Sequence, residues 1–130
     1  MPYAVNMGDS RTIFAILALA TKTADFDSTG VNLQTKYLEG EMTITLDAIN
    51  RAGTNPTLAL KLQESSDNST WTDITGGAFT GLTTGSSTQS ISLNKDNLKE
   101  YIRVDGDIGG TNSPEYDLSI IATATQKYPA

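Results

Sequence analysis

The sequence predicts a single all-β domain, an antiparallel β-sandwich or jelly roll. Several segments alternate apolar and polar residues, the pattern of strands with one buried face. Clusters of Gly, Ser, Asn, Asp and Pro separate these segments, as turns do. Only one apolar run has a possible helical period. Short strands at this spacing are typical of sandwiches and barrels.

The chain begins with residues that show no periodicity. Residues 1–10 are therefore expected to form an N-terminal arm, and residues 11–130 the sandwich domain. The whole chain has 130 residues, of which 38% are hydrophobic, enough for one core. No apolar run has the length of a membrane span.

The ambiguous run covers residues 13–20, which are all apolar. A strand buried on both faces fits this run, and so does a short helix capped by Ser10. The neighbouring Thr residues and the β-rich remainder favour a strand. A secretory signal fits poorly, because Asp9 lies where positive charge is expected.

Clear alternation begins after Gly40 and continues towards the C-terminus. Strands are expected near residues 42–48, 58–62, 71–74, 91–93, 101–104 and 118–124. The predicted core residues lie on the apolar sides of these strands: Met42, Ile44, Leu46, Leu58, Leu60, Leu62, Ile91, Leu93, Leu118 and Ile120.

Two turn segments resemble each other. Residues 51–56 read Arg-Ala-Gly-Thr-Asn-Pro, and residues 109–114 read Gly-Gly-Thr-Asn-Ser-Pro. Each is followed by an alternating strand, so each is predicted to be a hairpin turn. Two related hairpins would place both turns at one end of the sandwich.

The chain lacks the residues on which most catalytic mechanisms depend. The chain has no His and no Cys, which excludes Ser-His-Asp, Cys-His and thiolate metal sites. Residues 25–30 resemble the start of a calcium loop, but its twelfth position is Lys36 instead of an acid. We therefore expect no catalysis, no cofactor and no metal.

The charge balance disfavours polyanionic partners. Fifteen acidic and nine basic residues give a net charge of −6, without a basic cluster. Phosphate contacts dominate nucleic-acid affinity, and anionic lipids attract basic segments. We expect neither nucleic acid nor a membrane as a partner.

Aromatic residues leave two interpretations open. Trp71, the only Trp, could stack on a sugar or pack on the domain, and packing is the commoner role. Tyr combines apolar area with a polar tip, so Tyr3, Tyr37 and Tyr128 are candidate interface anchors.

Residues 58–74 carry a family resemblance. An alternating strand ends in Leu-Gln-Glu-Ser, passes a Ser-Asp-Asn-Ser turn and resumes with Trp-Thr-Asp-Ile. This segment resembles a strand-turn-strand unit of small structural proteins of tailed bacteriophages, and the similarity extends over about residues 40–127. The resemblance implies a β-sandwich or jelly-roll protein of the virion.

The leading hypothesis is a capsid decoration or cement protein that stabilises the phage head lattice. It would be made in the host cytoplasm, lie on the capsid surface, bind the major capsid protein and form a homo-oligomer, either a trimer or a dimer. The alternatives are a carbohydrate- or receptor-binding module and a neck or tail-completion protein. The candidate partner-binding residues are Tyr3, Val5, Met7, Phe14, Ile16, Tyr37 and Tyr128.

Overall fold

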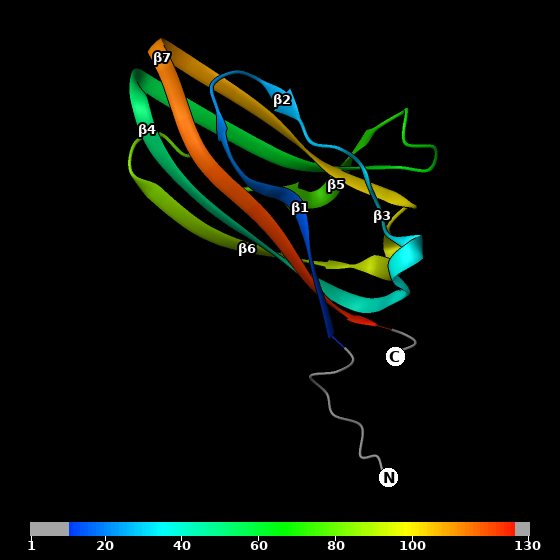
Figure 1. The fold of residues 1–130 in the computed structure, drawn as a ribbon. Helices are drawn as coiled ribbons and strands as arrows, with labels where there is room; N and C mark the ends of the chain where they lie inside the picture. The colour runs from blue at the N-terminus through cyan, green and yellow to red at the C-terminus, as the bar shows by residue number, and fades with distance from the viewer. Residues whose placement is uncertain (1–10, 127–130) are drawn as a thin grey trace.

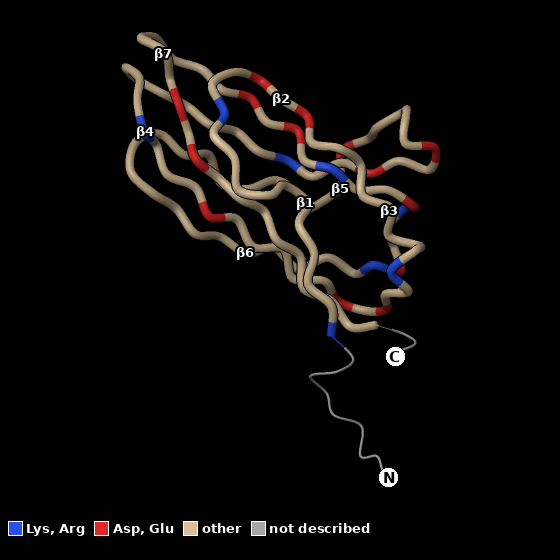
Figure 2. Tube along the Cα trace, viewed as in Figure 1, with Lys and Arg blue, Asp and Glu red and all other residues tan. Residues whose placement is uncertain are grey.

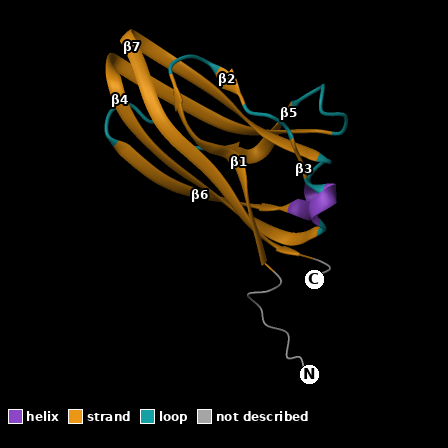
Figure 3. Ribbon diagram, in the orientation of Figure 1, coloured by secondary structure: helices purple, strands orange, loops and turns teal. Residues whose placement is uncertain are grey.

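The computed structural model describes residues 11–126, most of which lie in antiparallel strands (Figures 1 and 3). The strands are β1 (Arg11–Lys22), β2 (Phe26–Asp27), β3 (Val31–Asn32), β4 (Leu38–Ser65), β5 (Thr72–Ala78), β6 (Ser86–Asn94) and β7 (Tyr101–Gln126). Two short 3-10 turns, η2 (Gln34–Lys36) and η3 (Lys95–Asn97), complete the elements. The all-β prediction is confirmed, and the ambiguous run is a strand. Nowhere in residues 11–126 is there a helix able to cross a membrane.

β4 and β7 form one long antiparallel ribbon on which the other strands assemble. Leu38 at the start of β4 pairs with Gln126, and Ser65 at its end pairs with Tyr101. The ribbon folds back near its middle, so its two halves lie in different layers (Figure 1). The register shifts between residues 50 and 57 of β4 mark this corner.

Each half of the ribbon gains strands at both sides. In the first layer, β1 pairs with residues 116–125 of β7 and β6 pairs with residues 41–49 of β4, which gives the order β1-β7-β4-β6. In the second layer, β2 and β3 pair with residues 101–106 of β7, and β5 pairs with residues 61–64 of β4. The result is a β-sandwich made from one continuous sheet.

The core fills the space between the two layers, because alternate side chains of each layer point inward. Of the predicted core residues, all are buried except Ile91, which is half-buried against the cluster. Tyr116 is also fully buried, and its hydroxyl donates a hydrogen bond to the carbonyl of Thr83 at 2.7 Å. Burial raises the pKa of this phenol.

The two similar turn segments lie together at the ribbon corner. The prediction that each is a hairpin turn is wrong, because both halves of β4 pair with β7. Their common placement at one end is correct, since Thr54 pairs with Thr111. Gly53 and Gly110 have φ of 114° and 116°, and the two following Asn residues, at 55 and 112, also have positive φ.

At the corner, the backbone of each glycine lies close to a proline of the opposite strand. A Cβ on Gly53 would lie 2.7 Å from Cα of Pro114, and a Cβ on Gly110 would lie 2.9 Å from Cα of Pro56. Both positions also have a backbone conformation that side chains disfavour. The Gly-Thr-Asn sequence therefore occurs twice because two paired strands make the same corner.

We predict that Gly110→Ala destabilises the fold by roughly 1–3 kcal/mol, since it adds strain at positive φ and a clash with the β4 backbone. Urea unfolding measures the change. Gly81→Ala is the matched control, because its nearest neighbour would be the Leu58 carbonyl oxygen at 3.6 Å and its φ is not positive. Equal stability of the two variants would contradict the role of the corner.

Candidate functional site

Charged residues are distributed unevenly along the strands of the two layers (Figure 2). In the first layer, β6 and residues 118–126 of β7 contain no charged residue. In the second layer, Lys61, Arg103 and Asp105 project from the central strands. The charged residues of the first layer are Arg11, Lys22, Glu39, Glu41, Asp47 and Asp117. They lie towards the ends of its strands, so the central part of this layer is uncharged.

Hydroxyl side chains cover most of the uncharged part of this layer's outer surface. We call this surface the hydroxyl face; it is the outer side of β1, β7, β4 and β6. Its residues alternate with buried ones on β4 and β7 and with buried or half-buried ones on β6, while two register shifts interrupt the alternation on β1. They are Arg11, Ile13, Ala15, Leu19 and Thr21 on β1, Glu41, Thr43, Thr45, Asp47 and Ile49 on β4, Ser86, Thr88, Ser90 and Ser92 on β6, and Asp117, Ser119, Ile121 and Thr123 on β7.

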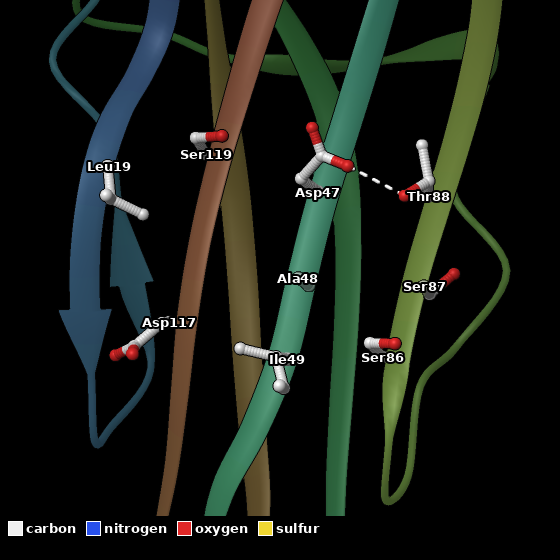
Figure 4. Close-up of a pocket in the computed structure, with 9 residues that line it drawn as sticks. All are labelled: Leu19, Asp47, Ala48, Ile49, Ser86, Ser87, Thr88, Asp117 and Ser119. Atoms are coloured by element: carbon white, nitrogen blue, oxygen red, sulfur yellow. Dashed lines mark hydrogen bonds between the residues drawn. The ribbon is translucent and has the colours of Figure 1, made fainter.

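A groove of about 240 Å³ crosses one end of the hydroxyl face (Figure 4). Leu19, 77% exposed, and Ile49, 41% exposed, give it an apolar wall. The hydroxyl of Thr88 donates to the carboxylate of Asp47 at 2.7 Å, and that of Thr21 donates to Asp117 at 2.6 Å. Both carboxylates of the groove therefore already accept a hydrogen bond from a neighbouring hydroxyl, and that of Asp117 also lies 3.6 Å from the guanidinium of Arg51.

The sequence-predicted partner residues are not all at this surface. Phe14 is half-buried, with the ammonium of Lys36 4.7 Å from its ring centre. Ile16 is 4% exposed and belongs to the core. Tyr37 is 60% exposed and follows η2 with φ of 51°. The remaining candidates, Tyr3, Val5, Met7 and Tyr128, lie outside the described residues.

In residues 11–126 the exposed large hydrophobic residues besides Tyr37 are Ile13, Leu19 and Ile49. Alternation along β1 points Phe14 and Ile16 inward, so Ile13 faces solvent. Counting in twos from Ile13 also reaches Leu19, because the two one-residue register shifts between Ala15 and Ala20 cancel each other. The exposure of Ile49 could have been predicted from the sequence. It directly follows Ala48, so it lies on the side of the strand opposite to the core residues.

A charged network lies on the outer face of the second layer. The ammonium of Lys61 lies 3.2 Å from the carboxylate of Asp73, and the amide of Gln63 donates to the same carboxylate at 2.9 Å. Hydrogen bonding to Asp73 raises the pKa of Lys61, while the bonds from Gln63 and Lys61 lower the pKa of Asp73. Arg103 donates to Gln63 at 2.9 Å and lies 3.7 Å from Asp27. These groups hold strands of the second layer together.

Trp71 packs against this network. The guanidinium of Arg103 lies 4.5 Å from its ring centre, a cation–π contact. A Cβ on Gly30 would lie 2.9 Å from the indole, so Gly30 leaves room for the ring. The half-buried indole therefore fits the packing interpretation better than the sugar-stacking one.

Two carboxylates meet beside the network. Asp27 and Asp105 are directly opposite in the pairing of β2 with β7. A hydrogen bond with Asp27, burial and the charges of Asp27 and Asp107 raise the pKa of Asp105 to about 6. In the apparent calcium loop, Asp25 accepts a hydrogen bond from the main-chain N–H of Ile108 at 2.8 Å. Over the described residues, His, Cys, Asp and Glu form no group of three or more that could hold a metal ion.

Solved structures share the fold of this chain at low sequence identity. The SPBc2 prophage-derived protein YomS is 11% identical with a TM-score of 0.53, over 89% of this chain and 93% of YomS. The PBSX exported protein XepA is 15% identical with a TM-score of 0.56, over 100% of this chain and 42% of XepA. The C-terminal family 22 carbohydrate binding module of Clostridium thermocellum Xyn10B is 12% identical with a TM-score of 0.52, over 91% and 86%.

No protein-family model matches the sequence, and no curated protein matches it. The structural likenesses therefore show a β-sandwich of jelly-roll type. This fold occurs both in prophage proteins and in a carbohydrate binding module, so it does not choose between these functions.

The proximity of Asp27 and Asp105 predicts a pH-dependent stability. The pKa of Asp105, about 6, exceeds its ordinary value of 3.8, so the folded state holds this proton more tightly than the unfolded chain. The resulting stabilisation is present below about pH 4 and is lost as the pH rises through about 6. We expect Asp105→Asn to raise the melting temperature, relative to wild type, more at about pH 7 than at about pH 4.

Thermal melts of both proteins across this pH range measure the difference. Asp96→Asn is the control, because it removes an exposed carboxylate outside the cluster. A difference between Asp105→Asn and wild type that stays constant with pH would contradict the assigned interaction.

Proposed function

We propose that the chain is a structural protein of a tailed-bacteriophage virion that decorates or cements the capsid. The observation that carries the proposal is the hydroxyl face, where Ile13 and Leu19 are more than two-thirds exposed on a layer with little charge. Exposed apolar residues among neutral polar ones are typical of protein interaction surfaces. The major capsid protein is the proposed partner, and no catalytic step is involved.

Several features support this position on the virion. The net charge of −6 suits the outer capsid surface, away from packaged DNA. The fold shared with YomS and XepA is compatible with a phage protein. A sugar-binding role gains less support, because Trp71 is already in contact with Arg103. The protein would be made in the host cytoplasm and then join the assembled head.

The direct experiment is to purify virions of a phage that encodes the chain and to quantify the protein on heads and tails separately. A copy number that matches the capsid lattice supports decoration. The copy number of a single ring at the neck or tail would replace decoration with the completion role. Absence from virions would overturn the proposal, and glycan binding by the isolated protein would then favour the sugar-binding alternative.

The hydroxyl face predicts a specific loss of capsid binding. Leu19→Ser should lower occupancy on capsids that lack the protein by about tenfold or more, because it removes an apolar contact at the interface. Its melting temperature should stay near that of wild type, since Leu19 is 77% exposed. Ala59→Ser, on the exposed side of the second layer, is the control and should bind normally. Normal binding by Leu19→Ser would contradict the use of this face.

Residues 1–10 are proposed as a second capsid contact, with Tyr3, Val5 and Met7 as apolar anchors. Their deletion should leave the melting temperature nearly unchanged, because residues 11–126 already form a continuous core among themselves. Occupancy on capsids should fall, since several weak contacts act together in an oligomer. Equal decoration by the truncated and full-length chains would exclude this contact.

A further inference from the structure

The sandwich ends in four lateral strand edges, and three of them are protected. β1 carries two register shifts, with Arg11 and Lys22 at its ends. β5 has a register shift opposite Lys61 and Gln63 and contains Asp73. At the remaining edge, β2 and β3 have only two residues each. Bulges, charges and short strands are the devices that prevent edge-to-edge association.

β6 lacks all of these protections. Its nine residues, Ser-Ser-Thr-Gln-Ser-Ile-Ser-Leu-Asn, contain no charge and no proline. It pairs with residues 41–49 of β4 one to one, without a register shift. Among the described residues, it is the only lateral edge strand that is long, regular and uncharged. Such an edge is a template for a further strand.

The main-chain groups on the free edge of β6 can be assigned from the ladder. The N–H of Asn50 donates to the carbonyl of Gly85 at 2.8 Å, and hydrogen-bonded pairs alternate in an antiparallel ladder. Residues 87, 89, 91 and 93 therefore direct their N–H and C=O groups to β4. Ser86, Thr88, Ser90, Ser92 and Asn94 direct theirs to the free edge.

We propose that the free edge of β6 pairs with β6 of a second copy, antiparallel and across a two-fold axis at Ser90. Ser90 then pairs with its own equivalent, Thr88 with Ser92, and Ser86 with Asn94. This register uses every free main-chain group of the strand. It also places small hydroxyl side chains opposite one another on the hydroxyl face, where Ser and Thr pairs are favourable.

Charge explains why the second copy would choose this edge. Each copy has a net charge of −6, so most approaches of two copies bring carboxylates together. An isologous antiparallel contact through β1 would instead bring Arg11 of one copy near Lys22 of the other. At β6 no charged side chain opposes another. Two-fold dimers are also the commonest closed assemblies.

The dimer would join the two first layers into one continuous sheet. Both hydroxyl faces would lie on the same side of that sheet. Each groove, which includes Ser86 and Thr88 of β6, would border the new junction. Since it concerns the isolated protein, this proposal does not depend on the virion role, and its test can fail independently of that role.

The test is the mass of the protein in solution. Wild type should have twice the mass of one chain by light scattering, and Ser90→Lys should have the mass of one chain, because two Lys residues would meet at the axis. Thr123→Lys adds the same charge to a central strand of the same face, and it should remain a dimer. A monomeric wild type, or a dimeric Ser90→Lys variant, would overturn the proposal.

Two further variants keep the test decisive if Ser90→Lys does not fold. Ser90→Pro removes a donor that faces the free edge and not β4, so it should fold and lose the dimer. Ser90→Cys introduces the only thiol of the chain and should yield an oxidised dimer, since paired strands bring the two Cα atoms within disulfide range. Leu19→Cys on β1 is the exposed control. Equal cross-linking of the two Cys variants would refute the β6 contact.

Discussion

The pairing of β4 with β7 is the constraint on which the rest of this structure depends. It runs from Leu38–Gln126 to Ser65–Tyr101 without a break in strand order, and every other strand attaches to one of these two. The corner at Gly53 and Gly110 turns this ribbon into two layers. The core, both outer faces and all four lateral edges follow from where the ribbon bends.

The same ribbon separates two kinds of surface. One half carries Thr, Ser and a few exposed apolar residues, while the other carries the network of Lys61, Gln63, Asp73 and Arg103. Charged groups that bridge strands stabilise a layer but resist desolvation at an interface. A neutral layer is easier to cover with another protein. The division of charge therefore corresponds to a division between a structural face and a binding face.

Local pattern was enough to predict most strand segments and most of the core, but not that residues 42–48 and 58–62 belong to the single long strand β4. Leu60 and Ile120 lie where alternation predicts, and only the edge-strand residue Ile91 is less buried than expected. The partners of each strand were not predictable, because a turn sequence such as Gly-Thr-Asn does not distinguish a hairpin from a corner. Nor were the bulges of β1, by which Leu17 packs against the core although it directly follows the buried Ile16. The corner and the bulges both depend on pairing with β7. A local sequence pattern holds no information about such long-range pairing.

The β4–β7 ribbon also determines how the chain can reach its native state. The start of β4 cannot pair until the end of β7 has been made, because these two segments are partners in the ribbon. Few of the ribbon's contacts can form before β7 has been synthesised, and closing such long loops carries an entropic cost. All-β domains with this topology fold slowly compared with helical ones. In the meantime β4 leaves its apolar side uncovered, so the newly made chain is most prone to aggregation just before β7 emerges from the ribosome.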